Sequence, residues 1–337
     1  MIKKMCCVLI STMLISFMIT GCSSNSDKQI KLGVSFGVGH ASRWESEKGY
    51  MESYAKELGI DIEVRLNQTD TPLTQEEDCK EMIDGGIDVL LLTPRDANNV
   101  SGIIAYAKQH NVKVICYARV VAEDGTDLFI GYDCEKIGQT LGKYLAETVY
   151  QGDYIILRGD ESDQNGILLY QGAMKEIETV KQDINILLDE PVAGWDPAKA
   201  KQMVKDAIIK NENKVDAILA PNDKIAGACA EAIAELGITT PVAITGMDAE
   251  LDAVKRILHG TQSVTIYMDL KLLAETAIDE ACNLANGKDV NTNAQYTVND
   301  QQIDAHLING YLITDKNLDK ILIESGYFTK EQVYETK

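Results

Sequence analysis

A repeated alternation of short apolar runs with segments of helix length restricts the fold of this 337-residue chain more than any other feature. The runs, of which Val89-Leu90-Leu91-Leu92 is typical, are continuously apolar. Such runs are expected of strands in a parallel sheet that helices cover on both faces. We expect strands at 30–35, 62–66, 89–93, 112–117, 128–131, 154–157, 184–188, 217–220, 242–245 and 264–267. The pattern predicts an α/β protein with two doubly wound parallel sheets.

Polar and aromatic residues follow these strands. In doubly wound folds ligands bind beyond the carboxyl ends of the strands, so these positions are candidates for a binding site. Both tryptophans of the chain, Trp44 and Trp195, fall in such loops. Their apolar faces suit the C–H faces of a sugar, and neighbouring Asn, Asp and Arg side chains suit its hydroxyls. The loops therefore indicate either sugar binding or tryptophans that only pack their own loops.

The N-terminus is typical of a lipoprotein signal peptide at residues 1–21. Lys3 and Lys4 precede an uncharged, mostly apolar run that ends in Ile19-Thr20-Gly21-Cys22. This run is slightly short for a membrane-spanning helix. We therefore expect a lipid on Cys22, a polar tether over 22–29, and an extracytoplasmic body anchored to the cell membrane by lipid only. A cleaved, non-lipidated signal peptide or an uncleaved anchor would leave the body on the same side.

Charge and cysteine content exclude other classes of protein. The chain has 52 acidic and 32 basic residues and a formal net charge of −20, which repels nucleic acid backbones and anionic lipid headgroups. The four histidines lack i,i+4 spacing, and no calcium loop is found, so we expect neither a metal nor a cofactor. Five widely spaced cysteines are expected as buried thiols in preference to disulfides: Cys79, Cys116, Cys134, Cys229 and Cys282.

Seven segments carry a resemblance to a known family: Arg43-Trp44, Asp88-Val89-Leu90, Gln151-Gly152-Asp153-Tyr154, Gly194-Trp195-Asp196-Pro197, Asn222-Asp223, Thr245-Gly246-Met247-Asp248-Ala249 and Gly260-Thr261-Gln262-Ser263-Val264-Thr265. These segments resemble the bacterial D-xylose-binding proteins, the sugar-binding components of ABC transporters. The similarity is collinear from about Ile30 to Gly326-Tyr327-Phe328 and covers nearly all of the chain after the signal peptide.

This resemblance implies the type I periplasmic-binding fold, in which three crossovers join two α/β lobes around a sugar-binding cleft. We expect the crossovers near 131–134, 265–269 and 298–303. The N-terminal lobe then comprises 30–132 plus 267–299, and the C-terminal lobe comprises 133–266 plus 300–337.

The resemblance also implies site residues. The family's sugar contacts correspond to Arg43, Arg119, Asn165, Asn222 and Asp248, and its stacking rings to Trp44 and Trp195. For the two arginines the alternative is a surface ion pair. We expect Asp223 to cap the helix that follows it and Asn222 to bind ligand.

Two positions depart from the family pattern. Ala118 stands where the family has Asp, and Met268 stands where it has Lys. The loss of both charges leaves the formal charge of the pocket unchanged. We therefore expect D-xylose as the ligand, with another pentose or a related small sugar as the alternative.

The resemblance implies a binding protein that closes on its sugar and is not an enzyme. Its partner is expected to be an ABC transporter permease or, in a sensing variant, the sensor domain of a membrane histidine kinase. One enzymatic alternative, a secreted hydrolase, comes from Gly33-Val34-Ser35-Phe36-Gly37, which matches the G-x-S-x-G elbow with Ser35 as nucleophile. That reading also needs an acid and a histidine at suitable positions.

Overall fold

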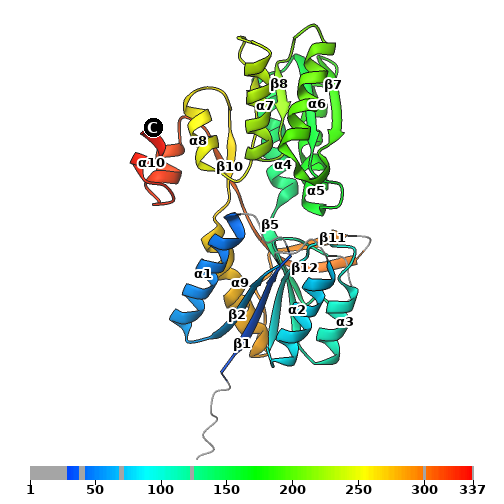
Figure 1. The fold of residues 1–337 in the computed structure, drawn as a ribbon, viewed down its shortest axis with the longest axis vertical. Coiled ribbons are helices and arrows are strands. Elements are labelled where there is room, and N and C mark those ends of the chain that lie inside the picture. The colour runs from blue at the N-terminus through cyan, green and yellow to red at the C-terminus, as the bar shows by residue number, and fades with distance from the viewer. Residues whose placement is uncertain (1–28, 38–41, 68–71, 122–124, 299–300, 336–337) are drawn as a thin grey trace, which may run out of the picture.

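The computed structural model describes residues 29–37, 42–67, 72–121, 125–298 and 301–335, which form two lobes stacked along the long axis of the molecule (Figure 1). The expected signal peptide, Cys22 and all but the last residue of the tether lie outside the described residues. Within the described ranges, no helix is both long and apolar enough to span a bilayer.

The N-terminal lobe is built on a seven-stranded sheet with the order β11-β12-β5-β4-β3-β1-β2. All neighbours pair in parallel except β11 and β12, which pair antiparallel. The strands are β1 (Lys31–Phe36), β2 (Asp61–Leu66), β3 (Val89–Thr93), β4 (Lys113–Tyr117), β5 (Leu128–Tyr132), β11 (Ala294–Val298) and β12 (Gln301–Ile308).

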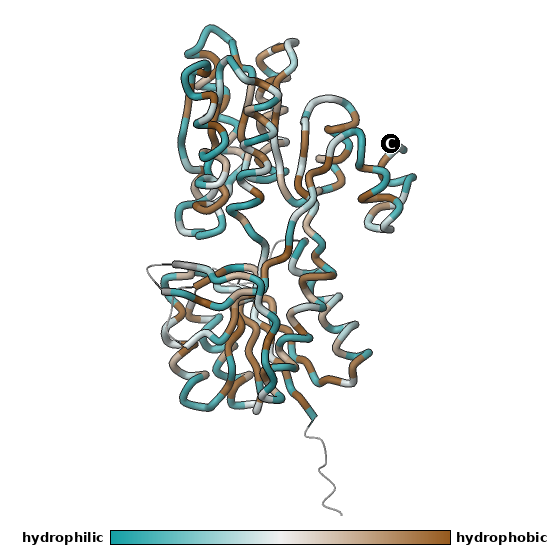
Figure 2. The backbone as a smooth tube through the Cα atoms, turned by 180° about the vertical axis from the view of Figure 1, so that it is seen from behind, coloured by the Kyte–Doolittle hydropathy of each residue, from teal (hydrophilic) through white to brown (hydrophobic). Residues whose placement is uncertain are grey.

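Helices cover both faces of this sheet, which explains its continuously apolar strands. Val89 and Leu91 of β3 point to one core, and Leu90 and Leu92 point to the other. Figure 2 shows the strands of this lobe as largely hydrophobic. The helices on the first face are α1 (Ser42–Leu58) and α9 (Leu270–Ala285), and those on the second are α2 (Pro72–Asp84) and α3 (Ser101–Gln109).

The C-terminal lobe has a four-stranded parallel sheet with the order β7-β6-β8-β9. Its strands are β6 (Gly152–Arg158), β7 (Ile184–Pro191), β8 (Ala217–Leu219) and β9 (Ala243–Ile244). One face carries α4 (Cys134–Thr148) and α5 (Gln164–Ile177), followed by the short turn η1 (Glu178–Val180). The other carries α6 (Pro197–Lys210), preceded by the turn η2 (Ala193–Trp195), and α7 (Asp223–Glu235).

A smaller unit beside this sheet contains the C-terminal end of the chain. The strands β10 (Thr265–Tyr267) and β13 (Tyr311–Ile313) pair antiparallel. The helices α8 (Leu251–Leu258) and α10 (Lys330–Tyr334) and the π-helical turn η3 (Asp319–Ile323) pack around them in a shared apolar cluster.

The ten strands expected from apolar runs correspond to β1–β10, so the predicted fold class is confirmed. The chain passes between the two sheets at Asp133, at Met268–Asp269 and at Asn309–Gly310. The expected third crossover at 298–303, and with it the lobe boundary at 300, is wrong. Because β12 pairs with β11 and, through Ala305 and Phe129, with β5, the chain stays in the N-terminal lobe as far as Ile308.

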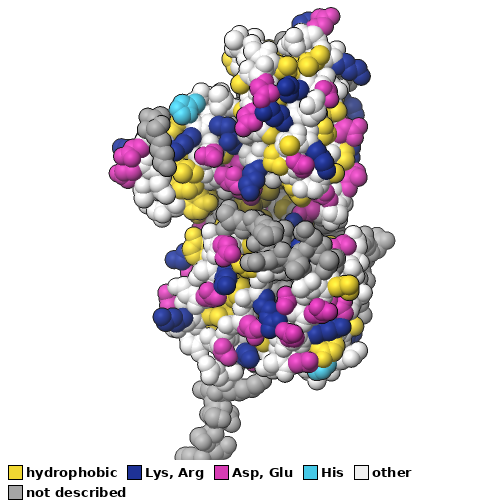
Figure 3. Space-filling view, in the orientation of Figure 1, with side chains coloured by type: hydrophobic (Ala, Val, Ile, Leu, Met, Phe, Trp, Pro, Cys, Tyr) yellow, Lys and Arg dark blue, Asp and Glu magenta, His cyan; other side chains and the backbone are white. Residues whose placement is uncertain are grey.

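All five cysteines of the body are free thiols, and all except the half-buried Cys282 are buried, as predicted. On the face shown in Figure 3, acidic side chains are spread over both lobes with basic side chains among them. The surplus of acids is therefore not concentrated in one region of this face.

Candidate functional site

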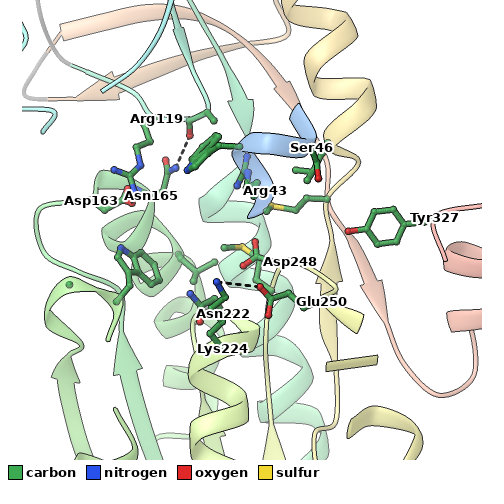
Figure 4. A pocket seen from close by; sticks show the side chains of 18 residues that line it. Arg43, Ser46, Arg119, Asp163, Asn165, Asn222, Lys224, Asp248, Glu250 and Tyr327 are labelled. Carbon is green, nitrogen blue, oxygen red and sulfur yellow. Dashed lines mark hydrogen bonds and ion pairs between the residues drawn. The ribbon is translucent and has the colours of Figure 1, made fainter. Parts of the chain in front are cut away.

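A cleft of about 430 Å³ between the lobes collects the polar residues that follow the strands. This volume lies within the range of small-molecule sites. Figure 4 shows side chains converging on it from both lobes. All seven residues predicted as ligand contacts line it: Arg43, Trp44, Arg119, Asn165, Trp195, Asn222 and Asp248.

Arg43 is held at the start of α1 by Glu47, one turn further on. Its Nε donates to Oε1 of Glu47 at 3.0 Å, and the Glu47 side chain is fully buried whereas Arg43 stays one-quarter exposed. Burial raises the pKa of Glu47 to about 7, although the charge of Arg43 opposes this. Burial lowers the pKa of Arg43, but Glu47 and other neighbours outweigh it and raise that pKa above its ordinary value. Arg43 therefore remains a fixed cation at the edge of the cleft.

A second nitrogen of Arg43, Nη2, is buried and has no hydrogen-bond partner among the described residues. An unpaired buried donor costs free energy that an acceptor of suitable geometry recovers. Nε of Arg43 is thus fixed by Glu47, whereas Nη2 can donate a hydrogen bond to a ligand.

Trp44 belongs as much to the core as to the cleft. It is 5% exposed, and its ring centroid lies 5.2 Å from that of Phe36, which in turn contacts Tyr117 at 5.9 Å. The guanidinium carbon of Arg43 lies 4.7 Å from the Trp44 ring centroid. Little of this ring is left to stack on a ligand, so it forms a wall of the cleft.

Trp195 is more accessible. It follows Gly194 in η2, and its side chain is half-buried. Both residues have left-handed backbones, with a φ of 53° at Trp195 and 72° at Gly194. The indole lies directly on Gly159, where an added Cβ would come within 2.5 Å of the ring atom Cη2. Glycine is required there by this close approach. Trp195 is therefore an aromatic platform supported from behind by backbone.

Arg119 and Asn165 make contacts that join the two lobes directly. Nη2 of Arg119, after β4, lies 3.2 Å from Oδ2 of Asp163, which caps α5 by accepting from the Asn165 backbone amide. Nδ2 of Asn165 donates to the backbone oxygen of Ala118 at 2.8 Å, and Ala118 has a left-handed φ of 59°. Oδ1 of Asn165 is buried without a partner among the described residues. We call the Arg119–Asp163 ion pair and the Asn165–Ala118 hydrogen bond the interlobe contacts.

Asn222 caps α7, since its Oδ1 accepts from the Ile225 amide at 2.9 Å. The prediction that Asp223 makes this cap is wrong, because the helix begins one residue earlier than expected. Asp223 is instead fully buried and accepts from Gln262 Nε2, the Glu250 amide and Thr265 Oγ1 at 2.8–2.9 Å. It braces the loop that carries Asp248.

Asp248 lies on a strained loop between β9 and α8. Its φ is 104° and that of Ala249 is 49°, values that non-glycine residues adopt at a cost. Burial raises the pKa of Asp248 to about 6, although the charge of Arg43 opposes this. Burial also raises the pKa of Asp223 to about 8, helped by the charge of Asp248 and opposed by its three donors. The loop thus carries one carboxyl into the cleft and rests on another.

Sequence reasoning missed further residues of the cleft. Asp163 and Lys224 adjoin predicted contacts at helix starts, so position relative to the strands could have found them. Tyr327 could not be found in this way, because it follows the last predicted strand by a long segment. The remaining residues are Ser46, Leu169, Gly194, Met247, Glu250 and Leu270, together with the two departures, Ala118 and Met268.

The described lining of the cleft has as many positively charged side chains as negatively charged ones. It includes the cations Arg43, Arg119 and Lys224 and, as anions, Asp163, Asp248 and Glu250. Nζ of Lys224 lies 3.8 Å from Oε1 of Glu250 (Figure 4). Such a site suits a neutral polar ligand better than a charged one, because a charged ligand would leave one charge unbalanced.

The structure contradicts the hydrolase reading of Ser35. Ser35 lies inside β1, where it pairs with Arg65 of β2 and Leu92 of β3, and it is buried. Its Oγ accepts from Gln75 Nε2 at 3.1 Å. A nucleophile elbow requires an exposed serine on a strand-to-helix turn.

Comparison with known proteins gives matches along most of the chain. Residues 33–289 match the family model described as "Periplasmic binding protein domain". The D-xylose-binding periplasmic protein of Haemophilus influenzae is 30% identical to this chain, and the alignment covers 93% of this chain and 94% of that protein. The D-xylose-binding periplasmic protein of Escherichia coli is 29% identical, and the alignment covers 96% of this chain and 98% of that protein. An ABC transporter solute-binding protein of Clostridium phytofermentans with bound β-D-glucose superposes with a TM-score of 0.84 at 23% identity, over 90% of this chain and 99% of that one.

Proposed function

This chain belongs to the periplasmic binding protein family, and on that premise we propose that it binds D-xylose, extracytoplasmically, in the cleft between its lobes. The observation that carries the proposal is the convergence of seven residues from both lobes on one cleft whose formal charges balance. The two relatives of about 30% identity, both D-xylose-binding proteins, support xylose over other small sugars.

The chemistry of these residues suits a pentose. Trp195 offers an apolar face to the C–H groups of the ring, and Arg43 offers donors in a fixed fork. Asn165 has both a donor and an acceptor, and Asp248 accepts from hydroxyls. We propose that these residues, with Trp44, Arg119 and Asn222, bind the sugar without any chemical step.

Binding is proposed to favour closure of the lobes. A ligand shifts a conformational equilibrium only by as much as it binds one state better than the other. A sugar between Arg43 of the N-terminal lobe and Asp248 of the C-terminal lobe contacts both lobes at once only when they are closed. Closure is therefore the signal that the bound state gives to a partner.

Titration calorimetry tests the ligand. We expect D-xylose to release heat with the purified protein, without added metal, and to bind more tightly than arabinose, ribose or glucose. In Trp195→Ala we expect about tenfold to hundredfold weaker binding. Tyr150→Ala is the matched control, because Tyr150 is 63% exposed and does not line the cleft. Tight binding of another sugar with no heat from xylose would overturn the choice of sugar, and no heat from any sugar would overturn the function.

We further propose that the protein is lipid-anchored through Cys22 and delivers its sugar to an ABC transporter permease. Isotopically labelled fatty acid should be incorporated into the wild type and lost in Cys22→Ser. Deletion of the gene should abolish xylose uptake. Unchanged uptake, together with recovery of a histidine kinase from membranes by the sugar-bound protein, would make it a sensor subunit instead.

A further inference from the structure

Tyr327 reaches the cleft from a part of the chain that contributes no other described lining residue. It follows η3 in the C-terminal segment, which packs on α8 and β10 through Leu318, Leu322 and Val333. Figure 4 shows Tyr327 at the side of the cleft, with its hydroxyl directed inward. The side chain thus belongs to the cleft by position although its segment lies far along the chain from the other lining residues.

The local backbone fixes where this ring lies. Gly326 has a left-handed φ of 79°, and hydrogen bonds from the Gly326 amide to the Ile323 oxygen and from the Phe328 amide to the Leu322 oxygen, both 2.9 Å, close the turn after η3. A glycine with this φ ends a helix and redirects the chain. The turn therefore directs Tyr327 away from the axis of η3.

Two aromatic contacts hold the ring once it is there. Its centroid lies 4.7 Å from that of Tyr267 and 4.5 Å from that of Phe328. Tyr267 is the last residue of β10, next to Met268 at the second crossover. The half-buried Tyr327 ring is thus supported by the strand that leads into the crossover.

The hydroxyl of Tyr327 has no hydrogen-bond partner that the structure records within its described ranges, whereas the hydroxyls of Tyr54 and Tyr334 donate to carboxylates. Burial, together with the charge of Asp248, raises the pKa of Tyr327 to about 12. The phenol therefore stays protonated at neutral pH and can both donate and accept.

Two apolar residues of the cleft lining explain why the hydroxyl of Tyr327 matters for binding a sugar. Met268 and Leu270 line the same cleft and offer no hydrogen-bond donor from their side chains. A sugar hydroxyl that faced them without another partner would lose its hydrogen bonds to water with no compensation. The hydroxyl of Tyr327, which lines the same cleft, can supply that partner.

We propose that Tyr327 is a further specificity-determining residue, whose hydroxyl forms a hydrogen bond with one hydroxyl of the bound sugar. This inference rests on the proposed function. It adds the C-terminal segment to sugar recognition, beyond the strand-end loops of the two lobes.

The test compares Tyr327→Phe with Tyr311→Phe by titration calorimetry against D-xylose and its 1-, 2-, 3- and 4-deoxy analogues, one for each hydroxyl of the pyranose ring. Tyr311 contacts the same Tyr267 ring, at 6.4 Å, but does not line the cleft, so it controls for changes in the aromatic cluster. We expect Tyr327→Phe to weaken xylose binding about threefold to tenfold, as for one neutral hydrogen bond, and Tyr311→Phe to leave it unchanged. For the one analogue that lacks the contacted hydroxyl, wild type and Tyr327→Phe should bind equally.

Equal affinity of wild type and Tyr327→Phe for xylose would overturn the inference while leaving the proposed function intact. A weakening of the same size for xylose and for every deoxy analogue would also overturn it, because the phenol would then shape the cleft without contacting a particular hydroxyl. If the wild type bound none of these sugars, the proposed function would fail and this inference with it.

Discussion

The two lobes line one cleft but hold their side chains by different means. In the N-terminal lobe, Arg43 is fixed by the buried Glu47, and Trp44 packs against Phe36 in the core. In the C-terminal lobe, Trp195 and Asp248 lie on loops with left-handed backbones. One wall of the cleft is therefore the outer layer of a hydrophobic core, and the other is a set of strained loops braced from behind.

This difference separates stability from binding. A substitution in the N-terminal wall removes core contacts and ligand contacts together. In the C-terminal wall, the left-handed loop backbone is held by residues behind it, such as Asp223. Truncating a side chain that points into the cleft therefore removes mainly ligand contacts. The contrast can be tested at three points.

The largest contrast is expected between the two tryptophans. Trp44→Ala removes a ring that is 5% exposed, and such truncations in cores cost about 3–5 kcal/mol of unfolding free energy. Trp195→Ala removes a half-buried ring that lies on Gly159, so we expect well under half of that loss. Urea denaturation of the unliganded variants, followed by circular dichroism, measures both. Equal losses would show that the two walls are equally part of a core.

The next contrast concerns pH. Burial raises the pKa values of Glu47, Asp223 and Asp248 to about 7, 8 and 6, so the folded state binds more protons than the unfolded chain at these sites. The free energy of unfolding should therefore fall as pH rises from about 4 to 8, and the unliganded protein should melt at a higher temperature at pH 6 than at pH 8.5.

The C-terminal wall should contribute more to this pH dependence, because it holds two of the three carboxyls. Asp248 faces Arg43, Lys224 and Glu250, and its charge helps to raise the pKa of Asp223. Asp223→Asn should therefore flatten the melting profile between pH 6 and 8.5 by more than Glu47→Gln does, because the pKa of Asp223 is about 8 and that of Glu47 about 7. Differential scanning calorimetry across this range decides the question, and a larger effect of Glu47→Gln would reverse the comparison.

The smallest effect is expected where the walls meet. The Arg119–Asp163 ion pair is partly exposed, at 24% and 11% of the two side chains, and pairs of this kind contribute about 0–1 kcal/mol. Asp163→Asn removes the charge of one partner and should shift the unliganded protein toward open forms. Small-angle scattering should then give a larger radius of gyration without sugar and the wild-type radius with saturating xylose. An unchanged radius without sugar would show that the interlobe contacts do not hold the lobes together.

Much of the fold and of the site follows from local sequence, because buried parallel strands need continuous apolar runs and their ends meet at one edge of a sheet. The hairpin of β11 and β12 does not follow from continuous apolar runs, because Gln302-Ile303-Asp304-Ala305 alternates polar and apolar residues, as strands near a sheet edge do. Asn222 caps α7 in place of Asp223 because the helix begins one residue earlier than expected.

Tyr327 shows a different limit. No local pattern places it in the cleft, since its position depends on how the C-terminal segment packs on α8 and β10. The roles of Ala118 and Asn165 across the cleft likewise depend on the relative placement of the lobes. Contacts between segments that are distant along the chain are set by tertiary packing, which local propensity does not encode.

The three passages of the chain between the lobes have a consequence for folding. The β12 strand, which pairs with β5 through Ala305 and Phe129, is synthesised after the whole four-stranded sheet of the other lobe. The first lobe can therefore complete its sheet only when almost the entire polypeptide is available, and pairings this distant in sequence form slowly. We expect a nascent chain truncated before β12 to leave β5 as an unpaired edge, a surface prone to aggregation, until its partner strand arrives.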